Sequence, residues 1–332
     1  MRQLIGLLAI LMACNAVGAL KQCRRCTCQK EGVLMLTGDT RHNFYWQPRL
    51  HWFDVDDGGV RSFERAPKLQ RFLGAVASLD DELVLVGGRA KRQSKVLPET
   101  FDGRGFASKK DSFALVPVIG FAKAVIGDEL YVCGGADPFA ARALNRCYVY
   151  SFESAEWRVL PQSGSAFTYL GASFSRDIFL YVAGGCEHWA CNQHRRRLRT
   201  VRRLDTRTLE WTTLPAQLPE PLIHATAAKR TSDVHETDYV VCGTGEYSSS
   251  VKKWRCYQLN VQTNKVTTFP SLPTGVLGKV KLLQCADRLV AVSGHYTIQA
   301  FKFDERTNGW KPIRLNGLRK YSRIDDVTCY RM

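Results

Sequence analysis

The chain has 332 residues, of which 45% are hydrophobic, 23% charged and 11% aromatic. These fractions are typical of a globular protein and exclude a disordered, collagen-like or polytopic membrane chain. The 47 basic and 31 acidic residues give a formal net charge of +16. This excess of positive charge favours anionic partners.

The first 19 residues, MRQLIGLLAILMACNAVGA, have the pattern of a secretory signal peptide. One early Arg precedes an apolar run from Leu4 to Cys14, and the small residues Val17 and Ala19 suit cleavage before Leu20. The run of about 11 apolar residues is too short for a bilayer, which takes roughly 20. The sequence therefore predicts a secreted, extracellular protein, and no transmembrane segment is expected.

An internal repeat of about 50 residues runs through the rest of the chain, and repeats of this length define a whole fold. Six apolar segments each end in a pair of small residues that includes Gly. They are VLMLTG (33–38), LVLVGG (83–88), LYVCGG (130–135), LYVAGG (180–185), YVVCGT (239–244) and LVAVSG (289–294).

Two further features recur in phase with these pairs. In five repeats a bulky residue follows the pair and has Pro four positions later: Phe63 and Pro67, Phe113 and Pro117, Trp157 and Pro161, Trp211 and Pro215, and Val266 and Pro270. The sixth repeat has Trp310 and then Arg314. In the best repeats another apolar residue lies seven positions before the Trp: Tyr150, Leu204 and Phe303.

These features predict a four-stranded antiparallel unit whose second strand is buried on both faces and whose Gly pair permits a tight exit. One such unit cannot bury its own faces, whereas six arranged radially can. The constellation resembles the kelch repeat, and the resemblance implies an all-β, six-bladed kelch β-propeller. A short strand precedes each Gly-pair strand except in blade one, so Arg323–Arg331 is expected to close blade one from the C-terminal end.

The predicted organisation has three parts: a signal peptide (1–19), a Cys-rich segment (20–32) and the propeller (33–332). The expected blades are about 33–67 with 323–331, 71–117, 118–161, 167–215, 223–270 and 279–314.

Cysteine spacing predicts disulfides in an oxidising compartment. Cys133 and Cys147 are 14 residues apart, as are Cys242 and Cys256, and each pair is expected to face across the second and third strands of a blade. The alternative, in a reducing compartment, is four buried thiols. Cys186 and Cys191 flank a short loop and are expected to close it. Zinc binding by Cys186, His188, Cys191 and His194 is the alternative, but this spacing matches no common zinc site, and no metal is predicted.

The remaining cysteines are predicted to lock the ring. Removal of the leader leaves an odd number of cysteines, so one thiol is expected to stay unpaired. Cys285 is the candidate for this free, buried thiol. The N-terminal triplet of Cys23, Cys26 and Cys28 is expected to supply one partner for Cys329, with Cys28 the candidate.

The connections that follow the Gly pairs and those that join successive blades are expected at one end of the ring, here called the loop face. Basic side chains are frequent in these connections, and two Trp accompany them. The candidate binding residues are Arg41, Arg89, Lys91, Arg92, Arg142, Arg195, Arg196, Arg197, Arg199, Trp46 and Trp189. Arginine suits bidentate recognition of carboxylates, sulfates and phosphates, so the predicted partner is an acidic protein segment or a sulfated glycan. The alternative is that these side chains are only solvated.

An enzyme is disfavoured, and no cofactor is expected. Some propellers of this fold are copper-radical oxidases of the galactose-oxidase type, which need two His and two Tyr converging on the ring axis. The seven His of this chain are scattered, and the sequence has no G-x-S-x-G, H-E-x-x-H or P-loop motif. Nucleic-acid binding is not expected, because no nucleic-acid fold motif accompanies the positive charge.

The repeats also resemble the propeller of the BTB-kelch substrate adaptors, in which a basic loop face captures acidic peptides. No BTB domain is expected beside this propeller. A cleaved leader favours a secreted, non-catalytic binding scaffold, and retention in the cytosol would favour the intracellular adaptor-like alternative.

Overall fold

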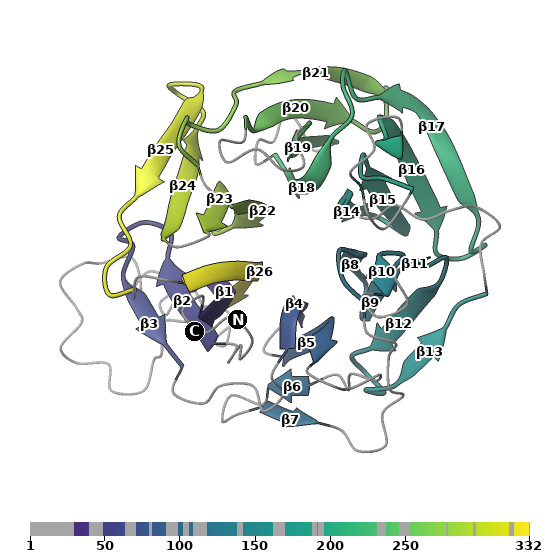
Figure 1. The fold of residues 1–332 in the computed structure, drawn as a ribbon, viewed down its shortest axis with the longest axis horizontal. Coiled ribbons are helices and arrows are strands. Elements are labelled where there is room, and N and C mark those ends of the chain that lie inside the picture. Colours follow the sequence, from purple (N-terminus) through teal and green to yellow (C-terminus); the bar gives the residue numbers. More distant parts are fainter. Residues whose placement is uncertain are drawn as a thin grey trace, which may run out of the picture.

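The computed structural model of the chain describes residues 30–39, 49–63, 71–79, 82–90, 99–101, 106–108, 118–137, 142–161, 170–187, 191, 196–230, 237–245, 253–276, 278–294, 297–318 and 322–331. In this part of the chain, six four-stranded antiparallel sheets are arranged radially around a central axis (Figure 1). The fold is therefore the predicted all-β, six-bladed propeller.

The strands that line the axis are β26 (Ser322–Arg331), β4 (Arg71–Leu79), β8 (Ala122–Ile126), β14 (Ala172–Arg176), β18 (Ile223–Lys229) and β22 (Lys279–Cys285), in the order of blades one to six. The second strands are β1 (Glu31–Asp39), β5 (Glu82–Ala90), β9 (Glu129–Cys133), β15 (Phe179–Ala183), β19 (Asp238–Thr244) and β23 (Arg288–Gly294).

The third strands are β2 (Arg49–Asp54), β6 (Glu99–Phe101), β12 (Cys147–Ser151), β16 (Thr200–Asp205), β20 (Arg255–Asn260) and β24 (Ile298–Asp304). The outer strands are β3 (Val60–Ser62), β7 (Phe106–Ser108), β13 (Trp157–Val159), β17 (Trp211–Gln217), β21 (Lys265–Phe269) and β25 (Gly309–Ile313). A two-stranded ribbon, β10 (Ala136–Asp137) with β11 (Arg142–Ala143), follows the Gly pair of blade three.

Blade one is completed by the C-terminal strand, as the sequence predicts. β26 pairs with β1 in antiparallel register from Glu31 opposite Arg331 to Asp39 opposite Ser322, with one irregularity between Leu36 and Thr37. The two ends of the described chain therefore lie in one sheet (Figure 1). This pairing closes the ring.

The seven-residue spacing before Trp is the register of the hairpin between the third and outer strands. Tyr150 lies opposite Trp157, and Phe303 lies opposite Trp310. Their ring centroids are 5.2 Å and 5.3 Å apart, within the range of favourable aromatic pairs.

Blade one departs from the sequence alignment at this position. The register places Val60 opposite Phe53, so Val60 and not Phe63 holds the place that Trp157 has in blade three. In blade two Phe106 lies opposite Phe101, so Phe106 takes this place instead of Phe113, which is outside the described residues. The spacing from Phe to Pro did not identify the residue opposite the third strand in these two blades. Strand register depends instead on the length of the preceding turn.

The hydrophobic core lies between neighbouring blades. Val240 and Phe269 of blade five, for example, belong to one buried cluster with Leu282 and Phe303 of blade six. The second strands are buried along most of their length because both of their faces meet other blades. Apolar area removed from water in these layers is the main stabilising contribution to the ring.

Candidate functional site

The Gly pairs meet the connections between blades at one end of the ring. Gly88 N–H donates to the carbonyl of Val118 at 2.8 Å, and Gly185 N–H donates to the carbonyl of Leu222 at 2.7 Å. Gly184 has a positive φ of 67°, and a Cβ there would lie 2.7 Å from the same Leu222 oxygen. A Gly is needed at this contact, because a side chain would push the next blade's connection away.

At this end the six inner strands enclose a cavity of about 160 Å³ on the ring axis. Every blade contributes to its wall, for example through Ala75, Lys123, Ser173, Thr226, Lys281 and Asp326. Two of its lining residues, Gly74 and Lys279, lie opposite Gly87 and Gly294 of the Gly-pair strands. The cavity is therefore the centre of the loop face.

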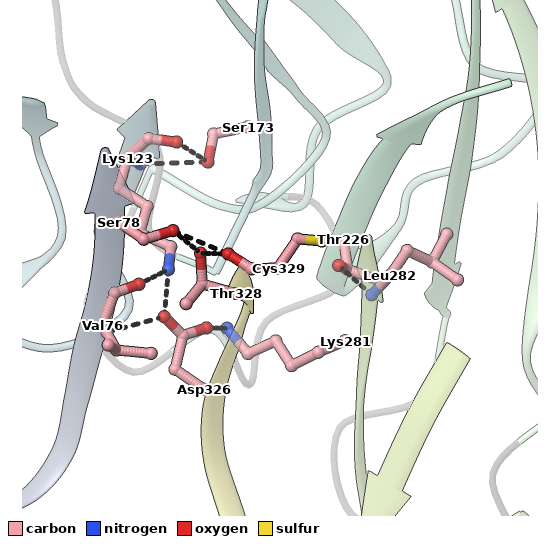
Figure 2. A network of polar contacts seen from close by, with 10 residues as sticks. All are labelled: Val76, Ser78, Lys123, Ser173, Thr226, Lys281, Leu282, Asp326, Thr328 and Cys329. Carbon is pink, nitrogen blue, oxygen red and sulfur yellow. Dashed lines mark hydrogen bonds and ion pairs between the residues drawn. The ribbon is translucent and has the colours of Figure 1, made fainter. Parts of the chain in front are cut away.

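Asp326 lines this cavity and is the centre of a network of polar contacts (Figure 2). The residue is 1% exposed and comes from β26 of blade one. Its carboxylate accepts hydrogen bonds from the Nζ of Lys123 in blade three and from the N–H of Val76 in blade two, the latter at 3.0 Å. The Nζ of Lys281 in blade six lies 3.1 Å from its other oxygen. One carboxylate thus links four blades.

The charges of these three side chains are coupled. Burial alone would raise the pKa of Asp326, but the two ammonium groups and the Val76 N–H hold that pKa below its usual value. Burial lowers the pKa of Lys123; the positive charge of Lys281 lowers it further, and Asp326 opposes both. Lys123 and Lys281 are close enough to repel each other, and Asp326 lies between them.

Hydroxyl side chains connect the remaining inner strands (Figure 2). Neighbouring inner strands belong to different sheets, so their backbone groups need partners from the next blade. Ser173 of blade four accepts from the N–H of Lys123 at 2.9 Å and donates to its carbonyl at 2.8 Å. Thr226 of blade five accepts from the N–H of Leu282 in blade six at 2.8 Å. These bonds fix the cavity wall.

Lys123, Lys281 and Asp326 were not among the predicted site residues. A signal was present in the inner strands: KVKLLQC alternates Lys with apolar residues, AKAVI places Lys123 between two Ala, and SRIDDVTCYR places two Asp between Ile324 and Val327. Such alternation is typical of a strand with one polar face, and in an inner strand that face looks onto the axis. The partners of each charge were not predictable, because they come from other blades.

The structure describes the side chains of three of the predicted binding residues. Arg196 and Arg199 are exposed in the segment that precedes β16, and the Nε of Arg199 donates to the carbonyl of Leu218 at 2.7 Å. For Arg89 and Arg142 only the strand positions are described, in β5 and β11. The other predicted binding residues lie outside the described part of the chain: Arg41, Trp46, Lys91, Arg92, Trp189 and Arg195.

Arg197 was predicted to be a binding residue, but it does not belong to an exposed surface. Only 8% of this residue is exposed. Its guanidinium donates to the carbonyl of Cys191 at 3.4 Å and to the carbonyl of Gly245 in blade five. Burial lowers its pKa. Consecutive arginines point in different directions, so this one turns inward between two blades and its neighbour Arg196 turns to solvent.

Three of the expected disulfides are present. Cys133 bonds to Cys147 and Cys242 to Cys256, each pair directly opposite across the second and third strands of its blade. Cys186 bonds to Cys191 within the loop of blade four. The last bond uses the two sulfurs that the zinc alternative required, so they are not zinc ligands in this structure. His188 and His194 lie outside the described residues.

The prediction for the remaining cysteines was wrong. Cys285 is not a free thiol, because it bonds to Cys329 with a Cα–Cα distance of 5.2 Å. This bond joins β22 of blade six to β26 of blade one, so Cys329 cannot also bond to Cys28. Cys23, Cys26 and Cys28 lie outside the described part of the chain. The ring is closed covalently, but between different strands from those expected.

Within the described residues, no group of three or more His, Cys, Asp or Glu side chains is placed to hold a metal ion. A search of the same residues finds no helix with the length and apolarity needed to cross a membrane.

Comparison with known proteins points to the same repeat. The kelch motif family model matches residues 117–164 and 180–216, which belong to blades three and four. Kelch domain-containing protein 10 of Xenopus tropicalis is 31% identical over 104 residues, which are 31% of this chain and 25% of that protein. The Xenopus laevis protein of the same name is 30% identical over 104 residues, with the same coverage. The matched segment thus spans about a quarter of each relative. The chain therefore contains kelch motifs in blades three and four of its six-bladed β-propeller.

Proposed function

We propose that the protein is a secreted, non-catalytic binding scaffold whose loop face holds an acidic protein segment or a sulfated glycan. The kelch propeller supports a scaffold for protein binding, since its loops vary on a rigid ring. The observation that carries the choice of an anionic partner is the charge at one end of the ring. Exposed Arg196 and Arg199 lie at the same end as a cavity in which two lysines share one buried carboxylate.

Two features support the extracellular part of the proposal. The first is the leader-like sequence of residues 1–19. The second is the set of four disulfides, which form and persist in oxidising compartments. The non-catalytic part rests on the sequence, in which the searched catalytic motifs are missing.

Retention on a heparin column tests the anionic partner. The double variant Arg196→Glu with Arg199→Glu reverses two charges on the loop face. The matched control is Arg207→Glu with Arg306→Glu, because both arginines are exposed in turns between third and outer strands, at the opposite end of the ring. Both variants change the net charge equally. We expect the loop-face variant to elute at clearly lower salt than the control. Equal elution of the two variants would contradict the proposal.

Expression in secreting cells tests whether the protein is extracellular. The protein is expressed with its natural N-terminus in secreting cells, and the intact mass is measured in medium and cytosol. A chain beginning at Leu20 in the medium supports the extracellular scaffold. A full-length chain kept in the cytosol with reduced cysteines would favour the intracellular adaptor-like alternative.

A further inference from the structure

The axial cavity has unused hydrogen-bond donors. An ammonium group has three N–H donors. Lys123 uses two of them, on Asp326 and on the carbonyl of Val76, and Lys281 uses one, on Asp326. Three of the six donors therefore have no partner within the described part of the chain. A ligand oxygen that accepts from these ammonium donors forms a charge-assisted hydrogen bond, which is stronger than one between neutral groups.

The wall of the cavity also carries an excess of positive charge. Its described lining residues include three lysines, Lys123, Lys279 and Lys281, and two aspartates, Asp325 and Asp326. The positive charge of Lys281 lowers the pKa of Lys123, which indicates repulsion between the two ammonium groups. Asp326 supplies one negative charge against the two ammonium groups. A bound anion would compensate the remaining positive charge, at the cost of repulsion from Asp326, and charges interact more strongly in a partly desolvated site than in water.

The cavity is large enough and open enough for a small ligand. Its volume of about 160 Å³ is many times the roughly 10–15 Å³ that one water molecule needs. The side chains of Lys123 and Lys281 are 22% and 33% exposed, so part of each lysine is accessible at the cavity wall.

We propose that this cavity binds one tetrahedral oxyanion, a sulfate or phosphate group, on the N–H donors of Lys123 and Lys281 that Asp326 leaves open. The two lysines come from blades three and six, on opposite sides of the axis (Figure 1). An ammonium group acts as a point charge and lacks the planar fork with which Arg selects a carboxylate. Donors that converge from two sides suit a compact anion with oxygens on all sides. The cavity site is a separate claim from partner binding on the loop face and would stand without it.

Calorimetric titration with sodium sulfate, at constant ionic strength in sodium chloride, tests the proposal. The variant Lys281→Gln removes the charge and keeps an N–H donor for Asp326. The control Lys265→Gln removes one charge from the exposed strand β21. We expect one saturable site per chain in the wild type and the control, and at least tenfold weaker binding in Lys281→Gln. A wild type without saturable binding, or equal affinity in both variants, would overturn the proposal.

A second titration, with a sulfated disaccharide, distinguishes a free sulfate ion from a sulfate group on a glycan as the ligand. Saturable binding of inorganic sulfate supports a free ion. Binding of the disaccharide alone, again lost in Lys281→Gln, assigns the site to a sulfate group on a glycan. If neither ligand depends on Lys281, the cavity is not an oxyanion site.

A measurement on the wild-type protein covers the case in which Lys281→Gln fails to fold. Lysines are acylated with a small anhydride in the presence and absence of sulfate, and the modified peptides are quantified by mass spectrometry. Sulfate is expected to slow the modification of Lys281 several-fold and to leave Lys265 unchanged. Modification of Lys281 at the same rate with and without sulfate would overturn the proposal.

Discussion

Asp326 binds Lys123 across the ring axis, although 203 residues separate the two in the sequence (Figure 2). Asp326 lies on the strand that completes blade one, and Lys123 lies in blade three. The same carboxylate accepts from Val76 in blade two and from Lys281 in blade six. The strand that closes the ring is therefore held from several sides by one buried side chain.

Replacing Asp326 by Asn is expected to lower the free energy of unfolding by about 3 kcal/mol. Removing one partner of a buried ion pair leaves charge without compensation, which costs roughly 3–5 kcal/mol. Solvent reaches both lysines, so the lower end of this range applies. Urea unfolding followed by tryptophan fluorescence measures the effect.

The matched control is Asp56→Asn. Asp56 is exposed, and its carboxylate lies 3.5 Å from the Nζ of Lys302. Exposed ion pairs contribute only about 0–1 kcal/mol. A loss of stability in Asp326→Asn no larger than that in Asp56→Asn would show that the four-blade contact contributes little.

The contribution of Asp326 should depend on pH in a defined direction. The pKa of Asp326 in the folded protein lies below its usual value of 3.8, so the unfolded chain takes up the proton first as the pH falls. The contribution is thus complete above about pH 5 and is lost as the pH falls through the folded pKa. Unfolding is measured in urea at several pH values for the wild type and Asp326→Asn. The stability difference should stay constant from pH 7 to pH 5 and shrink below pH 4. A difference that grows on acidification would contradict this assignment.

The bond between Cys285 and Cys329 should stabilise the closed ring by roughly 2–4 kcal/mol, the usual range for a disulfide. It joins blades six and one and closes a segment with a sequence separation of 44. The double variant Cys285→Ala with Cys329→Ala is compared with the wild type by urea unfolding. Peptide mapping of the unreduced protein provides the control. An alkylated, free Cys285 in the wild type would contradict the pairing.

Arg197 should affect stability, whereas Arg196 should not. Arg197→Ala leaves the carbonyls of Cys191 and Gly245 without their donor, which costs roughly 1–3 kcal/mol for buried polar groups. Arg196→Ala changes an exposed side chain, for which about 0.5 kcal/mol or less is expected. Thermal unfolding of the two single variants measures the contrast. Similar unfolding temperatures would indicate that Arg197 is not a structural residue.

Contacts local in the sequence were predicted well from the sequence. The Gly pairs, the 14-residue separation of Cys133 from Cys147 and the seven-residue step from Tyr150 to Trp157 all lie within one blade. Such patterns follow from the alternation of strand residues and the length of one turn. The closing strand was also predictable, because blade one lacked an inner strand and the C-terminal segment matched the missing pattern.

The number of blades and the strand order in each blade could be predicted from the sequence, and so could the partners of the disulfides within blades. Three contacts were revealed by the folded ring alone: the bond of Cys285 to Cys329, the burial of Arg197 between blades four and five, and the link of Asp326 to Lys123 and Lys281. These contacts connect different blades, so they depend on how the whole ring brings distant segments together at its axis. Repeat periodicity specifies each unit and its neighbour, but it carries no information about which side chains meet where six units converge.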